Sequence, residues 1–171
     1  MLKEIRPGLA RIAIFWNPEL EVLEKRRERM ETAVRNLGVE LHVVGIRYAR
    51  DLERAFATTP VASAEALVLP EQAVLLRREI SLLALQRRLP TVAGDRWFVQ
   101  GGGSMSYGPD PADIYERAAS YAGKLLRGGR PHDLPVEEPS RFELVISRIT
   151  AKALGLTIPP ALIARADQVI E

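Results

Sequence analysis

Residues 11–18 of this 171-residue chain read Arg11-Ile12-Ala13-Ile14-Phe15-Trp16-Asn17-Pro18. The short apolar run is typical of a buried strand, and the Asn-Pro pair that follows is typical of a helix start, with Asn17 as the N-cap. From residue 19 to residue 37 apolar side chains recur on one helical face, and Gly38 is expected to end the helix in a left-handed conformation. The stretch therefore predicts a strand that leads directly into an amphipathic helix.

The same unit recurs further along the chain. Strands are expected at 40–46, 64–69 and 90–93, a short helix at 51–58 and a longer one at 71–88. The strand starts are spaced about 25 to 29 residues apart, which is the length of a strand-helix unit in a parallel sheet. The sequence therefore predicts an α/β fold, with a mainly parallel sheet and helices on both of its faces.

After Val92 the pattern changes, and residues 95–100, which include Trp97, are expected to form a turn or a short helix. Three consecutive glycines, Gly101-Gly102-Gly103, are interpreted as a flexible crossover, and a brief strand follows at 104–107. Asp110 and Pro111 predict a helix start, and the helix to residue 126 has small apolar residues on one side. A further strand at 142–146 and two short helices complete the expected elements.

Composition excludes several kinds of chemistry. The chain has no cysteine and two histidines, so disulfides, thiolate nucleophiles and clustered metal ligands are not expected. Residues 104–108 resemble a nucleophile elbow without its first glycine, but the bases available to Ser106 are His42 and His132, which lie far apart in the sequence. Neither a dinucleotide nor a P-loop glycine motif is present. We therefore predict no enzymatic activity, no cofactor and no metal.

Charge and hydropathy narrow the possible partners. The net charge is +2, with 24 basic and 22 acidic residues interleaved rather than gathered in a stripe, so nucleic acid is not an expected partner. No apolar run approaches the roughly 18 residues that a membrane-spanning helix requires. A small-molecule ligand or a protein partner is the remaining expectation.

In open α/β sheets, ligands bind outside the carboxyl ends of the strands. The side chains expected at those ends form a mixture of aromatic, amide, carboxylate and hydroxyl groups, which suits a small polar or aromatic molecule. The candidate ligand-binding residues are Trp16, Asn17, Glu71, Asp95, Ser106 and Tyr107. Three of them have a purely structural alternative: Asn17 and Asp95 as caps, and Trp16 as a core residue.

Several segments together resemble a known family. They are residues 11–14, the Asn17-Pro18 turn, the run 102–108, and the segments 133–136, 142–146, 150–159 and 164–171. In order and spacing they resemble the second half of ABC transporter substrate-binding proteins, of the subfamily that includes tryptophan- and tyrosine-type binders. One departure is the run Gly94-Asp95-Arg96, where the family often shows Tyr-Glu-Arg.

The resemblance implies a type I periplasmic-binding fold, in which two α/β lobes joined by a hinge close on a ligand and present it to a membrane permease. On this view residues 1–100 form an α/β ligand-binding lobe, and residues 101–171 form the hinge crossover, a helix and the C-terminal segment. The chain is then expected to be a C-terminal half, and the helix at 110–126 is expected to pack against a first lobe outside it. The alternative is a free-standing α/β interaction domain that self-associates.

Localisation follows the same two interpretations. The resemblance implies a periplasmic or membrane-associated protein. The sequence as given begins without a signal peptide, which would place the product in the cytoplasm if that is the true start. The implied partners are a small molecule such as an amino acid, an ABC permease, and either a first lobe or a second copy of the chain.

Overall fold

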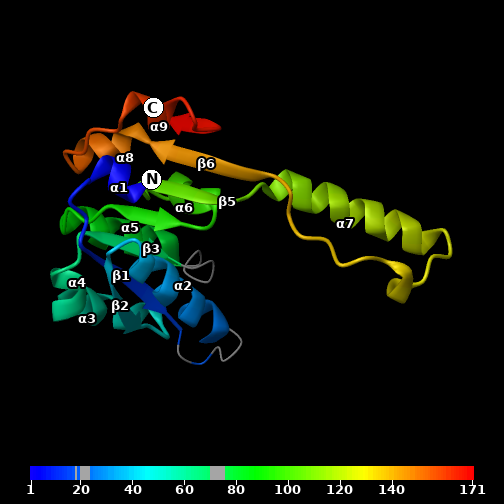
Figure 1. The fold of residues 1–171 in the computed structure, drawn as a ribbon, viewed down its shortest axis with the longest axis horizontal. Coiled ribbons are helices and arrows are strands. Elements are labelled where there is room, and N and C mark those ends of the chain that lie inside the picture. Colours follow the sequence, from blue (N-terminus) through cyan, green and yellow to red (C-terminus); the bar gives the residue numbers. More distant parts are fainter. Residues whose placement is uncertain (18, 20–23, 70–75) are drawn as a thin grey trace.

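The computed structural model describes residues 1–17, 19, 24–69 and 76–171. Its centre is a seven-stranded sheet in the order β2-β1-β3-β4-β5-β6-β7 (Figure 1). Strands β1 to β5 run parallel, β6 is antiparallel to β5, and β7 is parallel to β6. The strands are β1 (Arg11–Trp16), β2 (Glu40–Gly45), β3 (Ala66–Leu69), β4 (Thr91–Ala93), β5 (Met105–Pro109), β6 (Phe142–Ser147) and β7 (Gln168–Ile170).

Helices connect these strands. Those of the described residues are α1 (Leu2–Ile5), α2 (Glu24–Asn36), α3 (Leu52–Ala57), α4 (Thr59–Ala62), α5 (Arg77–Gln86), α6 (Arg96–Gln100), α7 (Pro111–Leu126), α8 (Arg148–Ala153) and α9 (Pro160–Ile163), with the 3-10 turns η2 (Ala49–Asp51) and η4 (Pro131–Asp133). The predicted α/β class and the four predicted parallel strands are confirmed. Helices α1 and α4 and strand β7 were not predicted.

The two faces of the sheet carry different cores. Side chains alternate along each strand, so Phe15 of β1 and Leu67 of β3 face one side, where they pack with Phe56 of α3 and Phe98 of α6. The opposite side of β1 packs against Val34 of α2, and further along it β5 and β6 pack against α1 and α9. Helices therefore cover both faces, as the sequence predicted.

The helix boundaries agree with the sequence where they can be compared. Helix α2 ends at Asn36, and Gly38 has a φ of +64°, the left-handed conformation expected of it. The helix starts predicted at residues 19 and 71 fall on or beside residues outside the described part of the chain. The expected N1 position of Pro18 also lies outside it.

The glycine run at 101–103 is not a crossover out of the sheet, which corrects the sequence interpretation. A Cβ on Gly103 would lie 2.2 Å from the Phe98 ring, so the chain here packs tightly beneath α6 as it turns into β5. Strand β5 then pairs with β4 and β6. The chain leaves the sheet only after Pro109, so the predicted boundary at residue 100 falls inside the sheet.

Residues 110–141 form a projection that we call the arm; the sheet and the helices around it are called the body. Figure 1 shows α7 extending away from the body, with the returning chain beside it. Arg117 of α7 donates to Asp113 at 3.0 Å and to Glu137 of the return segment at 2.9 Å. The Tyr121 hydroxyl donates to the Pro135 carbonyl at 2.6 Å. The return segment therefore covers the polar side of α7.

The other side of α7 is open to solvent. Its exposed apolar residues, which we call the open face, are Ile114, Tyr115, Ala118, Ala119, Ala122, Leu125 and Leu126. Leu126 is the extreme case, at 88% exposed. This agrees with the expectation that the small apolar side of this helix has no partner in the described part of the chain.

Candidate functional site

The carboxyl ends of the parallel strands meet at one edge of the sheet. Asn17 follows β1 and Asp95 comes two residues after β4, and β3 runs parallel between these two strands. The two residues therefore lie along the same edge, as the sequence predicted from their positions at strand ends.

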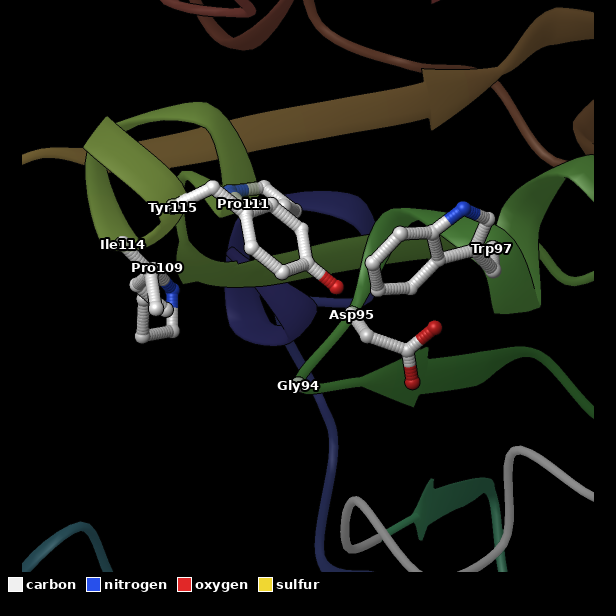
Figure 2. A pocket seen from close by; sticks show the side chains of 7 residues that line it. All are labelled: Gly94, Asp95, Trp97, Pro109, Pro111, Ile114 and Tyr115. Carbon is white, nitrogen blue, oxygen red and sulfur yellow. The ribbon is translucent and has the colours of Figure 1, made fainter. Parts of the chain in front are cut away.

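A cavity of about 320 Å³ opens at this edge, at the point where the arm joins the body (Figure 2). It is lined by Gly94, Asp95, Trp97, Pro109, Pro111, Ile114 and Tyr115, and we call it the junction pocket. In Figure 2 the rings of Trp97 and Tyr115 and the carboxylate of Asp95 border the same space. An apolar pocket with one carboxylate is typical of a site for a small ligand that carries one polar group.

Asp95 is a helix cap, which is the structural alternative that the sequence suggested. Its Oδ1 accepts a hydrogen bond from the Phe98 backbone N–H at 3.0 Å, so it is the N-cap of α6. It also lines the junction pocket. The capping bond holds the carboxylate at the start of α6.

The turn that carries Asp95 rests directly on the backbone of β5. A Cβ on Gly108 would lie 1.8 Å from the Gly94 carbonyl oxygen, a distance that no side chain can occupy. Glycine at position 108 therefore permits the close approach of the two backbones. This contact sets the floor of the junction pocket.

Trp16 does not line the site. It is 6% exposed and packs with Met30 of α2 and Leu41 of β2. Its place in β1 explains this, because it has the same parity as Ile12 and Ile14, whose side chains also lie on the α2 side of the sheet. The structural alternative considered for Trp16, a core residue at the sheet end, is the one observed.

The remaining predicted residues are dispersed. Ser106 is 1% exposed on the α6 side of β5, and its hydroxyl has no hydrogen-bond partner among the described residues. Tyr107 points to the other side of the sheet and stacks on Phe142 with 5.8 Å between ring centroids. The Asn17 side chain accepts from the Glu19 N–H at 3.0 Å. Glu71 lies outside the described residues.

Sequence reasoning missed the residues that line the pocket with Asp95. Trp97 was assigned to a turn or short helix, and Tyr115 to the apolar side of a helix that packs elsewhere. The sequence did offer one signal for Trp97: it lies only two residues after Asp95, which was a predicted site residue. Nothing local in the sequence indicates that the first turns of α7 fold back beside that turn.

Two kinds of feature are absent from the described residues. In the parts of the chain that the structure describes, no group of three or more His, Asp or Glu side chains could hold a metal ion. Among the described helices, none is long and apolar enough to cross a membrane.

A mainly parallel sheet covered on both faces, with a pocket at the carboxyl edge of its strands, defines a ligand-binding α/β lobe. The family profile described as ABC transporter substrate binding protein matches residues 1–170, so the chain belongs to that family. The family is a class of binding protein rather than a class of enzyme.

Known proteins agree with this fold. The chain has a TM-score of 0.88 to a conserved domain protein from Vibrio cholerae, at 24% identity, covering 98% of this chain and 57% of that one. It has a TM-score of 0.89 to an ABC domain in complex with L-Trp from Streptococcus pneumonia, at 20% identity, covering 99% and 58%. A curated relative, the uncharacterized protein RP367 of Rickettsia prowazekii, is 24% identical over 146 residues, 82% of this chain and 46% of that protein. The chain thus spans about half the length of these relatives.

Proposed function

We propose that this chain supplies one ligand-binding lobe of an ABC-importer solute-binding protein, and that the junction pocket is its share of the binding site. The observation that carries the proposal is the position of the pocket, at the carboxyl edge of a parallel sheet and beside the arm. Two-lobed binding proteins close by a hinge around the ligand, and a pocket beside the arm, where a second lobe is proposed to dock, supports this assignment.

The pocket favours a small aromatic molecule that carries an amine. Trp97 and Tyr115 offer ring faces for stacking an aromatic group, and Asp95 offers a carboxylate to an ammonium. The streptococcal neighbour binds L-Trp, which supports an aromatic amino acid as the ligand of this chain too. The other candidate residues lie outside the pocket and are given a smaller role in the proposal. Asn17 lies along the same edge of the sheet, and Ser106 and Tyr107 belong to β5, the strand that leads to the pocket.

An ABC permease is the proposed membrane partner, and the proposed location is the periplasm or the outer side of the membrane. Both proposals rest on family membership. No catalytic step is proposed, because the pocket holds one carboxylate and two aromatic rings but no paired nucleophile and base.

The open face of α7 is the proposed docking surface for a second α/β lobe. Both structural neighbours extend well beyond the part that this chain covers, and the comparison spans 98–99% of this chain, so the arm is included in it. Small residues such as Ala118 and Ala122 permit close packing of that helix. The alternative, self-association through the same face, predicts a concentration-dependent dimer.

Ligand-observed NMR tests the binding proposal, because it detects weak complexes. We expect L-tryptophan and tryptamine to bind and 3-indolepropionate, which lacks the amine, to bind more weakly. Asp95→Asn keeps a capping side chain but removes the charge, so it should weaken binding of the amines. Asp51→Asn changes another capping carboxylate outside the pocket and is the control. Absence of binding by every aromatic amine to the wild-type chain would contradict the proposal.

Analytical ultracentrifugation distinguishes the two roles considered for the open face, docking of a second lobe and self-association. Ala122→Glu places a charge in its centre, and Val136→Glu places the same charge on the fully exposed return segment as a control. Self-association predicts that the first change abolishes a dimer and the second does not. A monomer at all concentrations would contradict self-association and leave the docking proposal in place.

A further inference from the structure

One side chain ties the junction pocket to the strands that follow the arm. Arg96 is the first residue of α6 and lies between two pocket residues, Asp95 and Trp97. Its Nη1 donates to Glu143 Oε2 of β6 at 3.1 Å, and its Nη2 donates to Gln168 Oε1 of β7 at 2.5 Å. Arg96 precedes the arm in the sequence, and both acceptors follow it.

The ion pair in this contact is partly buried, and the Arg96 side chain is 30% exposed. The Glu143 side chain is 12% exposed, and its Oε1 has no hydrogen-bond partner among the described residues. Burying a charge pair costs desolvation energy that largely offsets the attraction between the charges, so such a pair is a poor source of net stability. What it does provide is a defined geometry, because the planar guanidinium donates in fixed directions.

The charges around Glu143 come from each neighbouring element. Arg96 of α6 is its cation, Asp110 lies at the base of the arm, and Asp167 lies just before β7. Arg141 pairs with Asp110 at 3.8 Å, and the neutral Gln168 shares Arg96. Burial raises the pKa of Glu143, the two aspartates raise it further, and Arg96 opposes them.

The backbone of the same turn is held from another side. Gly94 rests on Gly108 of β5, as described above, which limits movement of the turn toward that strand. The Arg96 contacts add lateral attachment to β6 and β7. The turn is therefore attached to β5, β6 and β7, the first two of which border the arm.

We propose that Arg96 is a positioning residue for the junction pocket: by holding Glu143 and Gln168 it keeps the turn of Asp95 and Trp97 in place relative to the strands that carry the arm. This inference rests on the proposed function only in taking the pocket as a ligand site. It predicts that the ionised form of Glu143 sets the position of Trp97, and that protonation of Glu143 releases the turn.

The first test needs no ligand. The chain has two tryptophans, so 5-fluorotryptophan labelling gives two fluorine resonances, and Trp97→Phe assigns them. We expect the Trp97 resonance to shift as the pH is lowered through the raised pKa of Glu143, while the buried Trp16 resonance does not shift. In Glu143→Gln this pH dependence should be lost, and in Arg96→Lys the Trp97 resonance should broaden, since one ammonium cannot replace the two-pronged contact.

An exposed ion pair supplies the matched control. Arg148 donates to Glu171 at 2.6 Å, with both side chains more than half exposed, so Glu171→Gln removes a comparable charge outside the pocket. It should leave the Trp97 resonance unchanged. If the Arg96–Glu143 contact had a merely structural role, Glu143→Gln would lower the melting temperature without moving the Trp97 resonance. We expect the reverse: a changed signal together with an unchanged or raised melting temperature, because burial favours the neutral form of the side chain at this position.

The second test uses L-tryptophan as the probe. Arg96→Lys should weaken its binding about tenfold, the size of effect typical for loss of a charged hydrogen bond. If the wild-type chain binds neither L-tryptophan nor any other aromatic amine, the proposed function is contradicted, and the positioning role is then decided by the fluorine signal alone. If the Trp97 resonance is identical in wild type, Arg96→Lys and Glu143→Gln at every pH, the positioning role is overturned.

Discussion

The body and the arm use similar helices in opposite ways. Helix α5 of the body buries Ile80, Ser81 and Ala84 against the sheet. Helix α7 of the arm has 16 residues, yet within the described structure its one buried residue is Asp113. Its apolar side chains recur at helical spacing just as those of a core helix do.

The difference shows what a hydrophobic stripe does and does not predict. A stripe indicates that a helix has a side suited to burial, but it does not indicate which surface covers that side. For α5 the cover is the sheet of the same chain. For α7 the return segment covers the polar side, and the open face is left for the partner proposed above.

The strongest contrast between the two regions comes from one substitution made in each. Leu67→Ala in β3 removes a fully buried side chain and should lower the free energy of unfolding by about 2 to 5 kcal/mol. Leu126→Ala in α7 removes an exposed side chain and should change it by less than about 0.5 kcal/mol. Urea denaturation followed by circular dichroism measures both. Similar losses for the two variants would mean that the open face is buried in solution.

Two glycine substitutions sharpen the contrast at the point where the arm begins. Gly108→Ala forces a methyl group onto the Gly94 carbonyl and should cost about 1 to 3 kcal/mol or more. Gly123→Ala lies in α7 with its nearest neighbour at 3.6 Å, and should raise helix stability locally by up to about 1 kcal/mol. Thermal unfolding measures the first and amide exchange the second. A stable Gly108→Ala variant would show that the turn can move away from β5.

Helix caps give a smaller and more local comparison. Asp110 caps α7 by accepting from the Ala112 N–H at 2.9 Å, and Ser147 caps α8 by accepting from the Thr150 N–H at 3.1 Å. Each alanine variant should lose about 1 kcal/mol of helix stability. We expect Asp110→Ala to speed amide exchange in the arm without lowering the melting temperature of the body, whereas Ser147→Ala should lower it. Equal melting temperatures for these two variants would contradict the independence of the arm.

The smallest expected effect is a difference in pH dependence between two glutamates. Glu65 of the body accepts the N–H groups of Ala10 and Arg11 at 2.7 and 2.9 Å, which lowers its pKa. Its contribution to stability is present above the ordinary pKa and is lost as pH falls through the lowered one. Glu143, at the junction, has a raised pKa, so its contribution is present at low pH and is lost as pH rises through the raised value.

Melting temperatures measured from pH 2 to pH 7 check these signs. Relative to wild type, Glu65→Gln should lose stability chiefly above pH 4.5, and the difference should shrink in acid. Glu143→Gln should gain or hold stability at neutral pH and lose that advantage in acid. Parallel curves for the two variants would show that neither carboxylate titrates with the sign assigned to it.

Much of the fold was predictable because its signals are local. The strands at 11–15, 40–46, 64–69 and 90–93, and the end of α2 at Gly38, depend on residues within a few positions of one another. The place where the chain leaves the sheet was less predictable. Three glycines suggested a crossover at 101–103, but Gly103 packs closely on Phe98 and the chain continues in the sheet as β5 to Pro109.

The candidate site was predicted only in part, for a comparable reason. Strand ends located the edge at which the junction pocket lies and the role of Asp95 as a cap. The alternation of side chains along a strand places Trp16 on the α2 side and puts Ser106 and Tyr107 on opposite faces. The residues that join Asp95 in the pocket come from α6, the end of β5 and the first turns of α7. These elements meet only in the tertiary structure, and no short stretch of the sequence indicates that they do.

The amino-acid sequence alone determined the alternation of strands and helices, the parallel α/β class and the amphipathic side of α7, because hydrophobic periodicity, caps and glycine conformation act over a few residues. Only the tertiary structure decided which surfaces meet. Arg96 reaches Glu143 across 47 positions and Gln168 across 72. Contacts of such range depend on how the strands are ordered in the sheet, and a short window of sequence does not carry that order.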